Sequence, residues 1–195
     1  MLMFKAYRRL QQFTSRIIFK LLFAHRFKTF GRKTILVSPD KIEGEEYIEL
    51  EDNVSINSMA WLLALEQGNA KPRLLIKKGT VIGRFSHIVA LQHVEIENNV
   101  LIADKVYISD NIHDYSDINM PIMKQPVLFK APVIIGENSW IGENVSIIGA
   151  RVGKHCIIGA NTVVTKDIPN YSVAVGSPAK VIKQFNIEKN EWQKV

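Results

Sequence analysis

Aliphatic residues recur every six positions along most of this chain. From residue 42 onward they form five groups of three, and the members of each group lie six residues apart. The groups are Ile42, Ile48 and Val54; Ile76, Ile82 and Ile88; Ile96, Ile102 and Ile108; Ile135, Ile141 and Ile147; and Val152, Ile158 and Val164. A period of six does not fit an amphipathic helix, because alternate aliphatic residues would point to opposite sides of a helix with 3.6 residues per turn. An ordinary β-sandwich needs a period of two and hairpin turns, which residues 133–165 lack.

The residues between the aliphatic positions favour turns. Segments such as "IGENSW", "IGENVS" and "IGANTV" combine a short β-branched stretch with glycine and asparagine, which accept a positive φ. Three such hexads make one triangular turn of a parallel β-helix, in which the aliphatic residues point inward and successive coils stack at the strand spacing. The pattern therefore predicts a mainly β protein, a parallel β-helix of about five coils.

Three interruptions break the repeat. Residues 60–75 predict a loop with some packed residues, and the step from Ile147 to Val152 is one residue short. The longest interruption begins "ISDNIHDYSDINMPI" and predicts a protruding loop around residues 109–132. After Val164 two prolines end the repeat, and the last residues predict a short capping helix, because an open end of a β-helix exposes unpaired backbone.

The first residues of the chain predict an amphipathic helix. Its apolar positions recur at three to four residues: Met3, Tyr7, Leu10, Phe13, Ile17 and Leu21. Its cations interrupt every apolar run, so that neither a signal peptide nor a membrane span is expected: Lys5, Arg8, Arg9, Arg16, Lys20, Arg26 and Lys28. Two interpretations stay open. The favoured one is that the apolar stripe packs on the rest of the protein; the other is that it lies on an anionic membrane surface.

Length and composition fit one domain with small additions. We expect a basic amphipathic helix at 1–33, a β-helix domain at 34–168 and a C-terminal cap and tail at 169–195. The net charge of +6 is concentrated at one end and accompanies no recognisable nucleic-acid motif, so no nucleic acid partner is expected. The single cysteine, Cys156, excludes an internal disulfide and fits the reducing cytoplasm, with peripheral contact at the inner face of the membrane left open.

Three stretches resemble the hexapeptide-repeat acyltransferases. They are "NVLIADKVYISDNIH", "VIIGENSWIGENVSII" and "CIIGANTVVTKDIPNYSVAVGSPAKVIK". The resemblance covers roughly residues 40–185 and is strongest to maltose and galactoside acetyltransferases and to bacterial polysaccharide O-acetyltransferases; the end, "KQFNIEKNEWQKV", is similar to the tail of O-antigen and capsule O-acetyltransferases. It implies a left-handed β-helix, a hand that the spacing alone does not give. It also implies a homotrimer with active sites between subunits.

The resemblance implies that His113 is the catalytic base. It follows Ile108 by five residues, which is the family's distance, and an imidazole suits proton removal near neutral pH. Without the resemblance, a lone loop histidine would be interpreted as a solvated residue. Asp110, Asn111, Asp114 or a backbone carbonyl is expected to orient the ring. A backbone N–H near Trp140 to Gly142 is the candidate oxyanion donor.

Acetyl-coenzyme A is the donor that the resemblance implies, and no metal is expected. The positions that match the family's coenzyme contacts are Trp140, Gly142, Glu143, Ala160, Thr165, Lys166, Lys180 and Lys183. Glu143 stands where a small residue is expected, so only its backbone is expected to make a contact. The lysines suit the coenzyme's phosphates, although each is also compatible with an ordinary surface role.

The acceptor differs from that of the galactoside-type enzymes, since Ala90 and Leu91 replace their acidic pair. Nearby polar candidates are Ser86, His87, Gln92 and His93, joined by Asp114 and Asp117 in the loop. The expected function is an acetyl-coenzyme-A-dependent O-acetyltransferase acting on a sugar hydroxyl of a surface polysaccharide or of its lipid-linked precursor.

Three alternatives stay open. A sugar N-acyltransferase would use the same fold. A zinc hydratase of the γ carbonic anhydrase type would need three histidines, for which His87, His93 and His113 are the candidates. A catalytically silent β-helix that serves as an assembly module is the third.

Overall fold

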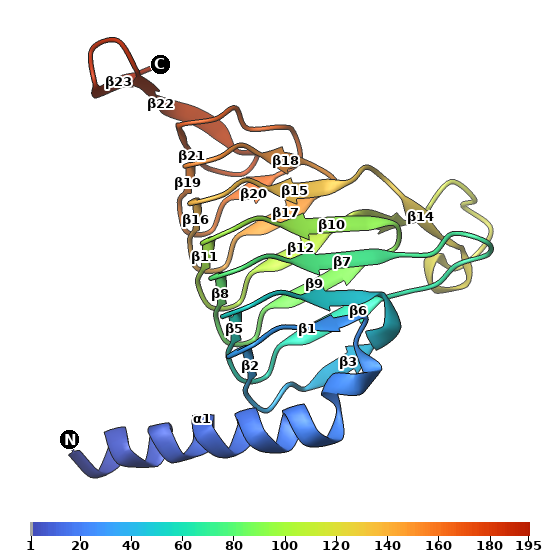
Figure 1. The fold of residues 1–195 in the computed structure, drawn as a ribbon. Coiled ribbons are helices and arrows are strands. Elements are labelled where there is room, and N and C mark those ends of the chain that lie inside the picture. The colour runs from blue at the N-terminus through green and yellow to red at the C-terminus, as the bar shows by residue number, and fades with distance from the viewer. Residues whose placement is uncertain (1) are drawn as a thin grey trace.

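The computed structural model describes residues 2–195, and the chain winds into a triangular prism with a long helix at one end (Figure 1). Met1, the first residue of the predicted segment 1–33, lies outside the described residues. So do the side chains of Lys5, Arg8 and Arg16, on which the predicted basic face of the helix partly depends. The helix, α1, spans Leu2–Leu22, and the first strand of the prism begins at Thr29.

Three parallel sheets form the faces of the prism. Face A contains β1 (Thr29–Phe30), β4 (Ile48–Leu50), β7 (Arg73–Ile76), β10 (His93–Ile96), β15 (Val133–Ile135) and β18 (Arg151–Val152). Face B contains β2 (Ile35–Leu36), β5 (Ser55–Ile56), β8 (Val81–Ile82), β11 (Leu101–Ile102), β16 (Trp140–Ile141), β19 (Ile157–Ile158) and β21 (Ser172–Val175). Face C contains β3 (Lys41–Glu43), β6 (Trp61–Ala64), β9 (His87–Ala90), β12 (Tyr107–Ser109), β17 (Ser146–Ile148) and β20 (Val163–Val164). Faces A and C have six strands each, so the prism has six coils rather than about five.

The predicted inward orientation and stacking of the last four aliphatic groups are confirmed. On face B, Ile102 pairs with Ile82 below and Ile141 above, and Ile141 pairs with Ile158. Every member of these groups is at most 1% exposed. Dry, stacked aliphatic columns of this kind supply most of the stability of the coil, because each buried side chain of this size contributes about 1.5–3 kcal/mol.

The first predicted group has the wrong register. Leu50, not Ile48, pairs with Ile76, and the second coil continues with Ile56 and Leu62. The error arose because alternate residues of a strand share a face, so that Ile48 and Leu50 both point inward from β4. Ile42 belongs to an additional coil at the N-terminal end, the first of the six, whose first inward position is the aromatic Phe30. Much of the predicted loop at 60–75 forms β6 and β7, and 65–72 connects them.

All interruptions of the repeat lie on one edge of the prism. The step from face A to face B, and from face B to face C, is six residues in every coil. Only the step from face C back to face A varies, and we call that edge the C–A edge. It accommodates the short helix η2 (Glu45–Tyr47), the 65–72 connection and the long excursion after β12. In a triangular coil this edge lies opposite face B, as Figure 1 shows.

The C-terminal end is closed by a β-hairpin, and the predicted capping helix was wrong. β21 extends face B, β22 (Lys180–Asn186) pairs with it antiparallel, and β23 (Glu191–Lys194) pairs with β22. The hairpin satisfies the free edge of β21 directly, which a helix laid over it would not do.

Aromatic rings close the N-terminal end. Phe19 of α1 lies 6.4 Å, between ring centroids, from both Phe27 and Phe30; Phe27 follows the 3-10 helix η1 (Ala24–Arg26). The apolar stripe of α1 does not pack on the rest of the chain, contrary to the favoured expectation: its described members are 41–88% exposed, namely Met3, Tyr7, Leu10, Phe13, Ile17 and Leu21. None of the described helices is long and apolar enough to cross a membrane.

The stacking predicts a sharp contrast between two adjacent residues. Replacing the fully buried Ile102 by alanine removes a link of the face B column and leaves a cavity, which should lower the free energy of unfolding by about 2–5 kcal/mol. The matched change at Leu101, which is 50% exposed on the outer side of the same strand, should alter it by no more than about 0.5 kcal/mol. Urea denaturation of both variants measures the difference, and equal losses would contradict the inward register.

Candidate active site

The long excursion at the C–A edge is an ordered hairpin, which we call the arm and define as residues 110–132. Its strands β13 (Asn111–His113) and β14 (Val127–Phe129) pair antiparallel, with His113 opposite Val127 (Figure 1). The arm leaves the prism after the fourth coil and returns at the fifth. A loop was predicted here, and paired strands give His113 a firmer support than an open loop would.

Asp110 fixes the base of the arm. Its carboxylate is fully buried and accepts backbone N–H bonds from Leu91 at 2.8 Å, Gln92 at 2.7 Å and His93 at 2.8 Å. Its backbone carbonyl accepts the N–H of Lys130 at 2.8 Å, on the returning side of the arm. One residue thus ties the arm to the turn of the coil below, which also explains the short connection between β9 and β10.

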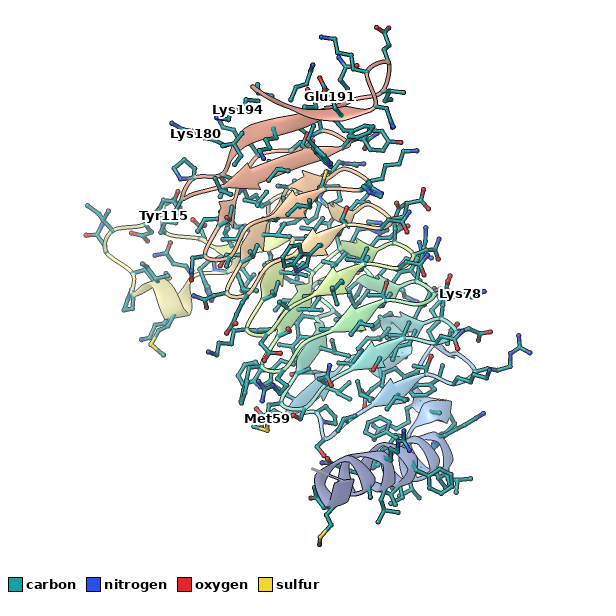
Figure 2. The ribbon with its side chains drawn as sticks, turned by 90° about the vertical axis from the view of Figure 1, so that its left-hand side faces the viewer. Met59, Lys78, Tyr115, Lys180, Glu191 and Lys194 are labelled. Atoms are coloured by element: carbon teal, nitrogen blue, oxygen red, sulfur yellow. The ribbon has the colours of Figure 1, made fainter. Side chains whose placement is uncertain are left out.

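Gln125 organises the tip of the arm. Its side chain is 7% exposed, and its amide nitrogen donates to the carbonyls of Asp117 and Met120, both at 2.8 Å. Its amide oxygen accepts the N–H of Asp117 at 3.2 Å. Tyr115, which Figure 2 labels at the outer end of this segment, is 69% exposed.

The His113 side chain is exposed, and none of the predicted orienting residues is hydrogen-bonded to its ring among the described residues. Asp110 is occupied by backbone N–H groups, and the Asn111 amide donates to Asp110 at 2.8 Å. Asp114 accepts the N–H of Ser116 at 2.9 Å, and this bond lowers the pKa of its carboxyl. The arm therefore presents an exposed imidazole at the C–A edge.

Several of the predicted coenzyme residues lie on another edge, where face B turns into face C. Gly142, Glu143 and Ala160 occupy stacked turns of the fifth and sixth coils there. A β-carbon on Gly142 would lie 2.7 Å from the Ala160 nitrogen, so the close stacking of the coils requires glycine at 142. The Glu143 carboxylate pairs with Lys105 at 3.4 Å, and the residue is exposed.

Two of the predicted oxyanion donors are already hydrogen-bonded. The Trp140 and Gly142 N–H groups donate to the carbonyls of Cys156 and Ile158, both at 2.8 Å, so neither is a free donor in the described chain. In the described chain, the Glu143 and Ala160 N–H groups have no backbone or side-chain acceptor, and both residues are exposed. These two amides are therefore unengaged donors on the turns that contain or stack on Gly142. Trp140 itself is 51% exposed on the outer side of face B.

The remaining coenzyme candidates lie toward the C-terminal end. Thr165 and Lys166 follow β20, and Lys180 and Lys183 lie on β22 opposite Val175 and Val173. The three lysines are exposed, and Figure 2 shows Lys180 close to the end of the stack. No salt bridge joins any of them to a described residue, so their charges are available to an anion.

One chain does not bring the two halves of the predicted site together. His113 extends from the C–A edge, whereas Gly142, Glu143 and Ala160 lie on the edge between faces B and C, and the width of face C separates them. Within one chain, therefore, the His113 ring and these turns do not meet.

The acceptor candidates are dispersed. Ser86 is 1% exposed, and its hydroxyl donates to the Gly83 carbonyl at 3.1 Å, so its side chain faces the core and not a substrate. His93 bonds to Glu95 at 3.3 Å. Asp114 and Asp117 lie in the arm beside His113, and Asp117 accepts the Asn119 N–H at 2.8 Å.

His87 lies in an aromatic column that sequence reasoning missed. On the outer side of face C its ring is 4.7 Å, between centroids, from Trp61 and 5.4 Å from Tyr107. Its Nε2 atom is buried without a hydrogen-bond partner, and burial lowers its pKa. A hollow of about 200 Å³ beside it is lined also by Asp40, Met59 and Phe85. The signal was available, because each ring directly precedes an inward aliphatic residue of face C once the coils are aligned.

The three histidines of the zinc alternative do not cluster within one chain. His87 begins β9 on face C, His93 begins β10 on face A, and His113 lies in the arm. Among the described residues, no three histidine, cysteine or acidic side chains are arranged to hold a metal ion.

Comparison with known proteins identifies the family. A family model described as the hexapeptide repeat of succinyl-transferase matches residues 132–166, the fifth and sixth coils. The Escherichia coli K12 protein WbbJ, a putative lipopolysaccharide biosynthesis O-acetyl transferase, is 35% identical over 152 residues, which cover 77% of this chain and 67% of WbbJ. The chain belongs to the hexapeptide-repeat acyltransferase family. The resemblance inferred from the motifs is confirmed, and with it the left-handed parallel β-helix.

Further relatives agree over shorter or more distant alignments. A probable acetyltransferase of Mycobacterium tuberculosis H37Rv is 45% identical over 104 residues, which cover 53% of this chain but only 34% of that longer protein. Among solved structures, a maltose O-acetyltransferase from Clostridium difficile 630 is 27% identical with a TM-score of 0.51, over 83% of this chain and 72% of that one. AntD, an N-acyltransferase from Bacillus cereus in complex with dTDP and 3-hydroxybutyryl-CoA, is 18% identical with a TM-score of 0.70, over 87% and 89% of the two chains, and shows the fold alone.

Asp110 provides a test of how the arm is held. Replacing it by alanine leaves three backbone N–H groups without their acceptor, and each buried unpaired group costs about 1–3 kcal/mol. We expect a clear loss of unfolding free energy and faster amide exchange at residues 91–93. Asp110→Asn, which keeps one acceptor oxygen, should lose less, and Asp117→Ala on the exposed part of the arm should leave both readouts near the wild-type values. Unchanged amide protection in Asp110→Ala would contradict this role.

Proposed function

We propose that this protein is an acetyl-coenzyme-A-dependent O-acetyltransferase that modifies a sugar hydroxyl. The observation that supports it most is the arm, which presents an exposed imidazole at the edge where the described part of the chain departs from its repeat. The names of its relatives support the reaction class, since WbbJ and the clostridial structure are both named O-acetyltransferases. A related fold, a hexapeptide-repeat acetyltransferase from Vibrio cholerae, is complexed with acetyl-coenzyme A.

His113 acts as the general base in this proposal. The acceptor oxygen bonds to the thioester carbonyl carbon while the imidazole takes the hydroxyl proton. The tetrahedral oxyanion then collapses and the carbon–sulfur bond breaks. The imidazolium returns its proton to the sulfur, so the products are an acetyl ester and free coenzyme A. Backbone N–H groups stabilise the oxyanion most effectively when they are already fixed in place, as the Glu143 and Ala160 amides are.

The donor site is completed by a neighbouring subunit of a homotrimer. The separation of His113 from the edge between faces B and C supports this, because the residues proposed for base and donor lie on different edges of one chain. In this arrangement the exposed arm of one subunit faces the Gly142, Glu143 and Ala160 turns of the next. Lys166, Lys180 and Lys183 then supply positive charge for the coenzyme's phosphates.

The acceptor we propose is a saccharide of a surface polysaccharide or of its lipid-linked precursor. The name of WbbJ, which refers to lipopolysaccharide biosynthesis, supports this class. The residues proposed to contact sugar hydroxyls are Asp114 and Asp117 in the arm, together with the hollow beside His87. Incubation of defined oligosaccharides with acetyl-coenzyme A, read out by product mass, identifies the sugar. Acetylation of amino sugars alone, at the amine, would instead favour sugar N-acylation, the reaction type in the name of AntD.

Removal of His113, but not of another exposed histidine, should lower the rate of acetyl transfer. His113→Ala should lower kcat for acetyl transfer about 10²- to 10⁴-fold, the usual contribution of a general base. The thermal unfolding of this variant should stay unchanged, because the side chain is exposed. His155→Ala, at another exposed histidine on the edge between faces A and B, is the matched control and should keep full activity. A His113→Ala enzyme with the wild-type rate would refute the assignment, and stoichiometric zinc together with carbon dioxide hydration would favour the hydratase.

The lysines of β22 should contribute to donor affinity. Lys183→Ala and Lys180→Ala should each raise KM for acetyl-coenzyme A about tenfold with little change in kcat, as expected from the loss of one charge-assisted contact. Lys189→Ala, in the exposed turn after β22, should leave KM unchanged. Acetyl-dephospho-coenzyme A tests the cause, because the effect should shrink for a lysine that binds the missing phosphate. Equal KM values for all four proteins would exclude these lysines from the donor site.

A further inference from the structure

The apolar stripe of α1 is uncovered along the whole described helix. Leu10 is 60% exposed, Phe13 56%, Ile17 41% and Leu21 73%, and Ile18 and Leu22 beside them are also more than half exposed. Large apolar side chains gathered in this way mark an interaction surface, whereas the same residues scattered singly over a protein would need no explanation. The six-coil core is complete without them, since the aromatic cluster around Phe19 already closes this end.

The stripe faces away from the prism. Phe19 is the α1 side chain that packs against the core, and Ile17 and Leu21 lie two residues before and after it, which places them on the opposite side of the helix. Leu10 and Phe13 continue their row toward the N-terminus, seven and four residues before Ile17. Figure 1 shows α1 crossing the end of the stack below β2 and continuing beyond it, so the helix lies flat along one end of the molecule.

Positive charge follows the border of this stripe. Lys5, Arg9, Arg16 and Lys20 are spaced as one row of the helix, and the last three directly precede Leu10, Ile17 and Leu21 of the stripe. The described members, Arg9 and Lys20, are exposed and have no acidic partner among the described residues. Long basic side chains at the edge of an apolar face can reach the headgroups while the apolar residues enter the acyl region.

The whole N-terminal end is electrically distinct from the rest of the chain. Residues 1–39 contain nine lysines and arginines and no aspartate or glutamate, whereas residues 40–195 contain 16 basic and 19 acidic residues. The first acidic residue, Asp40, is bound by the Trp61 indole on face C. Two copies meeting through this end would bring like charges together, so charge complementarity favours an anionic partner over a second copy.

We propose that α1 docks this protein on the surface of an anionic lipid bilayer, with its apolar stripe in the interface and the prism standing on the membrane by its N-terminal end. The helix lies in the plane of the bilayer, as amphipathic helices with basic borders do. Binding to the bilayer does not depend on the acyl-transfer chemistry. The choice of the cytoplasmic surface rests on the proposed function, because the donor that we propose is a cytoplasmic coenzyme. For an acceptor assembled on a lipid, docking raises the effective concentration of enzyme and acceptor.

Flotation of the full chain with vesicles tests the proposal. The protein should float with vesicles of equal parts phosphatidylglycerol and phosphatidylcholine, and should stay in the dense fraction with phosphatidylcholine alone. The double variant Leu10→Glu/Phe13→Glu should lower the partition coefficient by at least about tenfold, because two apolar anchors are replaced by charges. Ile187→Glu, a matched change at a 71% exposed residue at the opposite end of the stack, should float like the wild type.

A second variant separates charge from apolar contact. Arg9→Gln/Lys20→Gln should weaken binding at low salt by roughly tenfold, and the wild type should approach the same value as salt is raised. Acetyl transfer to a soluble saccharide should be the same in wild type and both α1 variants, so a failed flotation and a failed enzyme assignment give different results. The proposal is overturned by wild-type protein that does not float on anionic vesicles, by Leu10→Glu/Phe13→Glu protein that floats equally well, or by a change in oligomeric state of that variant without lipid, which would identify the partner as a second copy.

Discussion

Hydrogen bonding between stacked coils, in register on three faces, is the constraint on which the rest of this molecule depends. Each coil pairs with its neighbouring coils through faces A, B and C, so an extra residue inside any face would move the inward column out of line. Two of the three edges therefore keep a strict step of six, with residues such as Asn138 and Asn161 in the left-handed region at the turns. Variation in the number of connecting residues is confined to the C–A edge, where a loop of any size leaves the three hydrogen-bonded sheets intact.

That confinement shapes the candidate site. The arm extends from the variable edge, and Asp110 and Gln125 give it a fixed base and an ordered tip. The turns proposed to hold the donor lie on the edge between faces B and C, which keeps the six-residue step and where close stacking requires Gly142. Because the variable edge lies opposite face B, base and donor are separated by the geometry of the triangle itself. The active site that we propose is therefore shared between chains. α1 and the C-terminal hairpin lie at the two ends of the prism, away from both edges.

The sequence was sufficient for the coil because the inward positions repeat with a single spacing, and four of five aliphatic groups have the register predicted for them. The sequence did not give the correct register where two residues of one strand point inward, as Ile48 and Leu50 do. It also did not reveal the first coil, whose first inward residue is the aromatic Phe30. The predictions for the two ends of the chain were wrong because both depend on a surface that only the folded prism creates. That surface decides whether "KVIKQFN" pairs with β21 and whether the apolar stripe of α1 packs on its own chain. Motifs indicated His113, but they did not reveal that Ser86 points inward or that the Trp140 and Gly142 amides are already bonded.

The central claim is that the His113 imidazole, on the C–A edge of one chain, meets a thioester held at the edge between faces B and C of another chain. A crystal structure with a non-hydrolysable acetyl-coenzyme A analogue measures this directly. The account predicts a trimer in which the acyl carbonyl lies beside the Glu143 and Ala160 amides of one subunit, and the His113 ring of its neighbour lies within about 3 Å of the space an attacking oxygen would occupy. Analogue bound elsewhere on the prism, or a His113 ring directed into solvent in every subunit, would contradict it.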